Sequence, residues 1–240
     1  MKILILGGTG EARQLASALV ERRHEVITSL AGRTSHPVLP DGNLRVGKFG
    51  GVPGLLAYIK AHDIERVVDA THPYAGLISA NAVRATTLAG IPLVRLMRPQ
   101  WVEPEGANWV RVADVEAAAR ALPSGSKVLL TTGHGGLEDF LKRDDCDFVV
   151  RLIDPPDFTL PRHASLLLDR PPYGLEAERD LMRREVVTHL VTKNSGGKQT
   201  SAKLDAAREL GVTVIVIDRP VYGPALELGS VEEALAALEG

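Results

Sequence analysis

The sequence predicts an α/β protein built from two Rossmann-like three-layer domains with mostly parallel sheets. Two observations lead to this fold class. Short apolar segments alternate with segments of helical periodicity along most of the chain, which is typical of βαβ units. The apolar segments, such as KILIL and RVVDA, are continuous, which indicates strands buried on both faces of a parallel sheet.

The first part of the chain is expected to contain five strands and three helices. The strands are Lys2–Leu6, Glu25–Leu30, Leu44–Phe49, Arg66–Ala70 and Pro92–Met97, and the helices are Glu11–Arg22, Val52–His62 and Ala75–Ala89. The following residues 98–108, RPQWVEPEGAN, contain two prolines and a glycine without clear periodicity. We interpret this stretch as a linker.

The same alternation of strands and helices resumes after the linker. The strands are expected at Trp109–Val112, Lys127–Thr131, Phe148–Leu152, Ser165–Leu168, His189–Thr192 and Val212–Ile217, and the helices at Val115–Ala121, Gly136–Lys142, Leu175–Arg184, Lys198–Leu210 and Val231–Leu238. Residues 1–98 and 99–240 are therefore expected to form two domains, with the active site in the interdomain cleft.

Composition indicates a soluble protein and excludes several partners. The chain has 240 residues, 45% hydrophobic and 24% charged, and a formal charge of −2, which gives no general attraction to nucleic acid or anionic membranes. No apolar run approaches the ~20 residues of a membrane span, and no signal peptide is visible. The single cysteine, Cys146, cannot form an intrachain disulfide. We expect a cytoplasmic protein without nucleic-acid or membrane partners.

A glycine-rich turn, GGTGEA, lies between the first strand and the first helix. Glycines there permit positive φ and let a phosphate approach the amides of a helix N-terminus. The spacing departs from G-x-G-x-x-G because the third position is Arg13. A tight strand-to-helix turn would give the same pattern, but its placement favours nucleotide binding. The candidate cofactor-binding residues of this turn are Gly7, Gly8, Thr9, Gly10 and Glu11.

The ends of the next strands add further candidates. The second strand lacks the acidic residue that binds the ribose of NAD and is followed by Arg33 and Thr34, which suit a 2′-phosphate and favour NADPH. A solvated loop arginine is the alternative. Gly50 and Gly51 follow the third strand and again free the backbone for close approach.

The fourth strand ends in DATHPYA, which places Asp69, Thr71 and His72 where open α/β sheets bind their ligands. No metal site is expected, because no second pair of ligands stands at a recognisable spacing.

Two polar strand ends in the second part predict an anion site. One is LLTTGHGG, with Thr132 and Gly133, and the other is TKNSGGKQTSAK before a helix. Hydroxyls, amides and lysines at one helix N-terminus attract anions, although a capped helix with a solvated lysine face would give the same pattern. The candidates from the second stretch are Lys193, Asn194, Ser195, Gly196, Thr200 and Lys203. A P-loop, a G-x-S-x-G elbow and the Y-x-x-x-K pair of short-chain dehydrogenases are all missing.

Taken together, these motifs resemble the precorrin-6A and cobalt-precorrin-6A reductase family of cobalamin biosynthesis. The matching stretches are GGTGEAR, SLAGRT, FGG, DATHPYA, LTTG and TKNSGGKQTSAKLDAARELGVTVIVIDRP, in the order of the family. The chain departs from the family pattern at Gly10, Lys48 and Tyr74. The resemblance implies an NADPH-dependent oxidoreductase that delivers a hydride to one carbon of precorrin-6A and a proton to its neighbour, giving precorrin-6B. The many carboxylates of that tetrapyrrole would fit the anion site of the second domain.

The proton donor and the exact reaction stay open at this stage. His72 is the first candidate for the donor, because histidine exchanges protons near neutral pH, and Tyr74 is the second. The alternatives for the function are a cobalt-precorrin-6A reductase using NADH, a different NAD(P)-dependent reductase, and a nucleotide-binding redox sensor. Adjacent enzymes of the cobalamin pathway are conceivable partners besides the tetrapyrrole.

Overall fold

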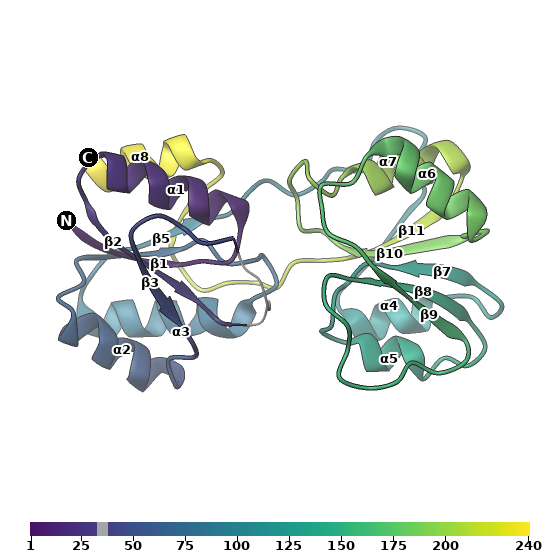
Figure 1. The fold of residues 1–240 in the computed structure, drawn as a ribbon, viewed down its shortest axis with the longest axis horizontal. Coiled ribbons are helices and arrows are strands. Elements are labelled where there is room, and N and C mark those ends of the chain that lie inside the picture. Colours follow the sequence, from purple (N-terminus) through teal and green to yellow (C-terminus); the bar gives the residue numbers. More distant parts are fainter. Residues whose placement is uncertain (33–37) are drawn as a thin grey trace. The chain divides into compact units, whose positions relative to one another are not determined.

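The computed structural model describes residues 1–32 and 38–240. They form two compact units, each with one six-stranded sheet between two layers of helices (Figure 1). Every strand pair of the described residues is parallel. The fold class predicted from the sequence is therefore confirmed.

The division of the chain differs from the prediction at its C-terminal end. Unit 1 consists of Met1–Pro99 together with Pro220–Gly240, and unit 2 is Gln100–Arg219. The expected second domain, 99–240, was therefore wrong for its final segment. The reason is that the last helix buries its apolar face against the first helix, inside the core of unit 1.

Unit 1 has the strand order β12-β5-β4-β1-β2-β3. Its strands are β1 (Lys2–Leu6), β2 (Glu25–Leu30), β3 (Asn43–Val46), β4 (Arg66–Asp69), β5 (Leu93–Leu96) and β12 (Leu226–Leu228), and its helices are α1 (Gly10–Glu21), α2 (Gly51–Ala61), α3 (Gly76–Ala89) and α8 (Val231–Glu239). Helices α1 and α8 cover one face of the sheet, and α2 and α3 cover the other (Figure 1).

The central position of β1 follows from its sequence. Ile3 and Ile5 enter the core beneath α1 and α8, whereas Leu4 and Leu6 enter the core beneath α2 and α3. Because successive side chains of a strand point to opposite faces, a continuous apolar run fits only a strand covered on both sides.

Unit 2 has the strand order β6-β11-β10-β7-β8-β9. Its strands are β6 (Trp109–Val112), β7 (Lys127–Leu130), β8 (Asp147–Leu152), β9 (Ala164–Leu168), β10 (His189–Lys193) and β11 (Thr213–Ile217), and its helices are α4 (Val115–Ala121), α5 (Leu137–Leu141), α6 (Leu175–Arg184) and α7 (Ala202–Leu210). Helices α4 and α5 lie on one face and α6 and α7 on the other (Figure 1). Among the described residues, no helix is both long and apolar enough to cross a membrane.

The two sheets have equivalent strand orders, and each takes one edge strand from the part of the chain that would be expected to complete the other sheet. The strand beside β5 is β12, which follows unit 2 in the sequence, and the strand beside β11 is β6, which follows β5. The chain therefore leaves unit 1 before its sheet is complete and returns to it after unit 2.

Helix α7 begins later than the sequence predicted, at Ala202 and not at Lys198. Gly196 and Gly197 have φ angles of 68° and 81°, in the left-handed region, and a turn follows them. Residues 199–201 form a turn in place of the predicted first helical residues. Thr200 consequently lies in the turn before the helix.

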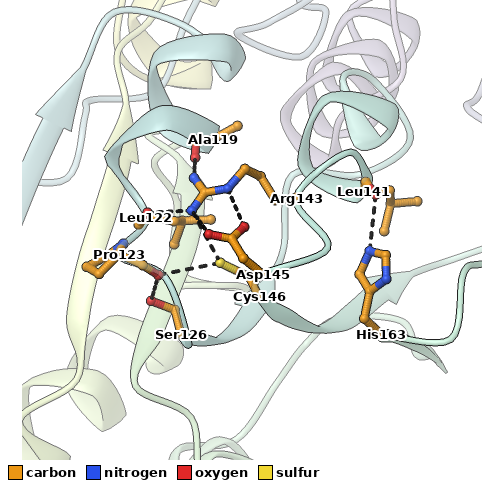
Figure 2. A network of polar contacts seen from close by, with 9 residues as sticks. All are labelled: Ala119, Leu122, Pro123, Ser126, Leu141, Arg143, Asp145, Cys146 and His163. Carbon is orange, nitrogen blue, oxygen red and sulfur yellow. Dashed lines mark hydrogen bonds and ion pairs between the residues drawn. The ribbon is translucent and has the colours of Figure 1, made fainter.

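A polar network closes the C-terminal end of α4 (Figure 2). The guanidinium group of Arg143 donates hydrogen bonds to the carbonyl oxygens of Ala119 (2.6 Å) and Leu122 (3.0 Å) and pairs with Asp145. The thiol of Cys146 is buried beside this pair and donates to the carbonyl oxygen of Pro123. Burial raises the pKa of this thiol, so the single cysteine of the chain is a packing residue of unit 2.

Candidate functional site

The sheet of unit 1 has a topological switch point between β1 and β4. From β1 the chain builds outward through β2 and β3, and from β4 it builds outward in the opposite direction through β5. Ligands of open α/β sheets bind at the carboxyl ends of the strands at such a point. The predicted glycine turn follows β1 and the DATHPYA stretch follows β4, so the structure brings both motifs to this point.

The glycine turn has two positions that require glycine for different reasons. A Cβ atom on Gly7 would lie 2.8 Å from Cγ2 of Thr28, so the turn can pass the second strand only without a side chain. Gly8 has a φ of 121°, and a Cβ there would meet nothing within 4 Å. The space beside Gly8 therefore gives a ligand direct access to the backbone.

Thr9 ties the two motifs together. Its hydroxyl accepts a hydrogen bond from the amide of Ala12 (3.1 Å), which caps helix α1, and donates one to the carbonyl oxygen of Ala70 (2.8 Å). Because the single hydroxyl hydrogen is used for Ala70, Thr9 supports the site and offers a ligand its backbone amide. Gly10 is the first helical residue.

A buried acid holds Thr71 at the end of β4. Asp69 Oδ1 accepts hydrogen bonds from the Thr71 hydroxyl (2.7 Å) and amide (3.3 Å), and its Oδ2 lies 3.4 Å from Nε of Arg95. Asp69 and Arg95 are neighbours in the register of β4 and β5. The predicted Asp69 is thus a buried support for Thr71.

A small pocket lies at the switch point. It is lined by Thr9, Glu11, Thr71, Pro73, Leu96, Met97 and Arg98. The Arg98 guanidinium group pairs with the Glu11 carboxylate at 3.0 Å. Sequence reasoning placed Arg98 in the linker and missed it, although a basic residue just beyond a strand's carboxyl end could have been recognised by the rule that identified Thr71.

The two predicted proton donors lie next to this pocket in sequence. His72 is exposed, its Nδ1 accepts a hydrogen bond from the Tyr74 amide (3.3 Å), and the two rings lie 5.8 Å apart. Thr71 and Pro73, and neither of the two rings, contribute to the pocket lining.

Gly50 and Gly51 lie at the start of α2, also at the carboxyl edge of the sheet, with φ angles of 84° and 82°. Arg45 arranges the loop before them by donating to the carbonyl oxygens of Gly47 (2.6 Å) and Lys48 (2.9 Å). The predicted 2′-phosphate residues, Arg33 and Thr34, lie outside the described residues.

Unit 2 has an equivalent switch point between β7 and β10, and most of the predicted anion site gathers there. The Lys193 ammonium group, at the end of β10, donates to the carbonyl oxygen of Thr132 beyond β7 (2.7 Å). Gly133 follows with a φ of 73°. Ser195 continues the loop after β10, and its carbonyl oxygen accepts a hydrogen bond from Arg219 (3.1 Å).

Two predicted substrate ligands turn out to be internal to unit 2. The buried Asn194 amide group binds the backbone of Trp101, accepting from its amide (2.8 Å) and donating to its carbonyl oxygen (3.1 Å). Lys203 is 5% exposed and its ammonium group lies 5.4 Å from the Trp101 ring centroid. Burial, and then the charge of Arg151, lowers the pKa of Lys203 to about 7. Asn194 and Lys203 were predicted as substrate ligands, and the structure shows both side chains buried within unit 2 against Trp101.

A second pocket opens beside β8 and α6. Arg151 pairs with Glu178 at 3.0 Å, both side chains are buried, and the Arg151 guanidinium group stacks 3.9 Å over the Tyr173 ring. Burial raises the pKa of Tyr173. These three residues line the pocket together with Leu167, Asp169, Ala177, Leu181 and Arg184.

Comparisons with known proteins agree with the resemblance. The family model "Precorrin-6x reductase CbiJ/CobK" matches residues 2–239. The chain is 49% identical over 228 residues to a precorrin-6A reductase of Rhodococcus erythropolis, covering 94% of this chain and 92% of that one. It is 41% identical to a precorrin-6A reductase of Rhodobacter capsulatus, covering 100% and 93%.

A cobalt-precorrin-6A reductase of Priestia megaterium is 29% identical, covering 98% of this chain and 97% of that one. The solved structure of a CobK precorrin-6A reductase superposes with a TM-score of 0.94 at 40% identity, covering 100% and 96%. The chain therefore belongs to the precorrin-6x reductase family, a family of oxidoreductases in cobalamin biosynthesis.

Proposed function

We propose that this chain reduces precorrin-6A to precorrin-6B with NADPH. The observation that carries the proposal is the convergence of the Gly7–Glu11 turn and Thr71 around one pocket at the switch point of unit 1. Open backbone at Gly8, the N-terminus of α1 and the Arg98 cation suit the pyrophosphate of a dinucleotide. Arg33 and Thr34, from the sequence pattern, are proposed to receive the 2′-phosphate.

The Glu11–Arg98 pair would make the N-terminus of α1 suitable for an anionic nucleotide. A carboxylate at the N-terminus of α1 would repel a pyrophosphate, and Arg98, 3.0 Å away, offsets that charge and offers donors of its own. When bound, the nicotinamide would supply the hydride, and the residues of this chain would hold and orient the nicotinamide ring.

The substrate groups are proposed to bind at the second switch point, in unit 2. Lys193, Gly133, Ser195 and Thr200 would contact the carboxylates of the tetrapyrrole. The buried Thr132 would support Lys193 through its carbonyl oxygen, and the buried Gly196 would shape the loop. Asn194 and Lys203 would support this site indirectly, by holding Trp101 and its loop in place.

The cobalt-free substrate is favoured by the pattern of similarity. Five relatives named precorrin-6A reductases are 39–49% identical to this chain, whereas three relatives named cobalt-precorrin-6A reductases are 28–29% identical. The cobalt form with NADH is the second candidate, and both share the nucleotide site.

A spectroscopic titration tests the proposal. NADPH and NADH are added separately to the purified protein, then each with precorrin-6A and with its cobalt form, while the tetrapyrrole and reduced-nicotinamide bands are followed. Turnover with NADPH and the cobalt-free substrate is expected. Arg33→Ala should narrow the preference for NADPH, whereas Arg84→Ala, an exposed arginine on α3, should leave it unchanged. No binding of either nucleotide would refute the proposal.

The proton donor is tested in the same assay. His72→Ala should lower turnover more than Tyr74→Phe if His72 delivers the proton. Normal turnover of His72→Ala would exclude that role.

A further inference from the structure

Arg95, in strand β5, carries a charge that is fully buried. Its side chain is 0% exposed, at the centre of three interactions. Nε lies 3.4 Å from Asp69 Oδ2, and Nη1 donates to Glu227 Oε1 (2.7 Å) and to the carbonyl oxygen of Gly223 (3.1 Å). Its guanidinium carbon lies 4.7 Å from the centroid of the Tyr222 ring.

Retaining a buried arginine needs a reason. Desolvating a guanidinium group is costly, and a buried ion pair often stabilises a fold no better than apolar residues of the same size. The cost here is higher still, because Nη2 of Arg95 is buried without a hydrogen-bond partner among the described residues. Packing alone would be served as well by an apolar side chain, so the charge is better explained by what Arg95 contacts.

The contacts of Arg95 lead to the nucleotide pocket. Asp69, 2% exposed, would be a buried uncompensated carboxylate without Arg95. Its other oxygen fixes both the hydroxyl and the amide of Thr71, which lines the pocket. Arg95 thus sets the position of Asp69, and Asp69 sets the position of Thr71.

The same side chain also binds the segment that returns from unit 2. Gly223 and Glu227 belong to Pro220–Gly240, which re-enters unit 1 and forms β12 beside β5. One guanidinium group therefore ties the strand end at the pocket to residues more than a hundred positions later in the chain.

We propose that Arg95 is a positioning residue for the nucleotide, acting through Asp69 on Thr71 and anchored by the returning segment at Gly223 and Glu227. The inference rests on the proposed nucleotide site of unit 1. Under this proposal Arg95 contributes to the binding of the nucleotide and does not affect the binding of the tetrapyrrole.

The test measures nucleotide binding and steady-state kinetics of Arg95→Lys, Thr71→Val and the double variant. Lysine keeps the charge but cannot bind Asp69, Gly223 and Glu227 together. The hydroxyl and amide hydrogens of Thr71 are both donated to Asp69, so the hydrogen bond at stake is one that the Thr71 hydroxyl oxygen would accept from the nucleotide. Its loss should raise the nucleotide Kd and KM about tenfold in each single variant. Turnover at saturation and the KM for the tetrapyrrole should stay within about twofold, as expected for lost ground-state binding.

The double variant separates positioning from a general loss of stability. If Arg95 acts through Thr71, the double variant should bind nucleotide no more weakly than the weaker single variant. Multiplied effects, or a Kd unchanged in Arg95→Lys while the protein melts earlier, would overturn the inference. Arg66→Lys, at the other end of β4, is the matched control and should bind normally.

A milder variant guards against misfolding. Glu227 is 55% exposed, so Glu227→Gln removes the anchoring charge without leaving a buried carboxylate. This variant should raise the nucleotide Kd two- to threefold, on the order of a weakened charge-assisted hydrogen bond. An unchanged Kd would show that the returning segment does not help to position the nucleotide. If the wild type itself binds no nucleotide, the proposed function fails and this inference fails with it.

Discussion

Replacing Arg143 with methionine tests how much the network of Figure 2 stabilises unit 2. The variant loses the hydrogen bonds to Ala119 and Leu122, carbonyl groups of the last turn of α4 that have no partner within the helix. A bond from a charged donor contributes about 1.5–3 kcal/mol. The Arg143 side chain is 25% exposed, so water replaces part of this, and methionine keeps most of the apolar contact. We expect a loss of about 2 kcal/mol in the free energy of unfolding.

The chain supplies its own probe for this measurement. Both tryptophans, Trp101 and Trp109, lie in unit 2, so urea unfolding followed by tryptophan fluorescence reports on that unit. The matched control is Arg120→Met, on α4, whose 65% exposed side chain pairs with Glu116. It should change stability by less than about 0.5 kcal/mol. Equal losses in both variants, or none in Arg143→Met, would refute the reasoning.

The network also predicts a dependence on pH. The hydrogen bond from Arg143 lowers the pKa of Asp145 to about 2. A carboxyl group whose pKa is lower in the folded state stabilises the fold above its usual pKa, and this contribution is lost as the pH falls from about 4 to about 2. Wild-type unit 2 should therefore weaken more steeply over that range than Arg143→Met. Identical slopes would show that the pair does not act this way.

Three further predictions concern the glycine turn of unit 1 and the buried Lys203 of unit 2. Gly8→Ala places a Cβ atom on a backbone with a φ of 121°. It should lower the free energy of unfolding by about 1–3 kcal/mol and weaken nucleotide binding at least tenfold. An unchanged nucleotide titration would contradict this prediction. Thr9→Val removes the cap of α1 and the bond to Ala70 and should cost about 1–2 kcal/mol in unfolding followed by circular dichroism. Lys203 has its pKa lowered to about 7 by burial, so the unfolded chain holds that proton to higher pH, and unit 2 should gain stability as the pH rises from about 7 to about 10. Lys203→Met should lack this gain in tryptophan-detected unfolding, and a gain that persists would assign it to another group.

The central strands could be predicted from the sequence because they are continuous runs of apolar residues. Lys2–Leu6 was expected and found with the same bounds, since four successive buried apolar residues fit only a strand covered on both faces. The edge strand β12 could not be found this way. Leu226–Leu228 is three residues long and Leu226 is 53% exposed, so its pairing with β5 decides its conformation and its sequence does not.

The residues of the candidate site likewise fall into those that local sequence predicts and those that depend on distant contacts. The Gly7–Glu11 turn and Thr71 were placed together in advance, because the carboxyl ends of parallel strands meet at one edge. Arg95 and Lys203 look like ordinary solvated cations in the sequence. Their burial depends on partners that are distant in the chain, such as Glu227 for Arg95 and Trp101 for Lys203, and single-sequence reasoning has no access to such contacts.

The exchange of β6 and β12 fixes the order in which the molecule is finished during synthesis. A ribosome releases the chain from its N-terminus onward. Every residue of unit 2 has been added to the chain once Arg219 is made, whereas unit 1 still lacks the strand and helix of Pro220–Gly240. Until α8 arrives, the apolar face of α1, with Leu15 and Leu19, has no cover from that helix. A chain that ends after Arg219 would therefore contain every residue of unit 2, whereas its unit 1 would lack β12 and α8 and leave the apolar face of α1 uncovered by that helix.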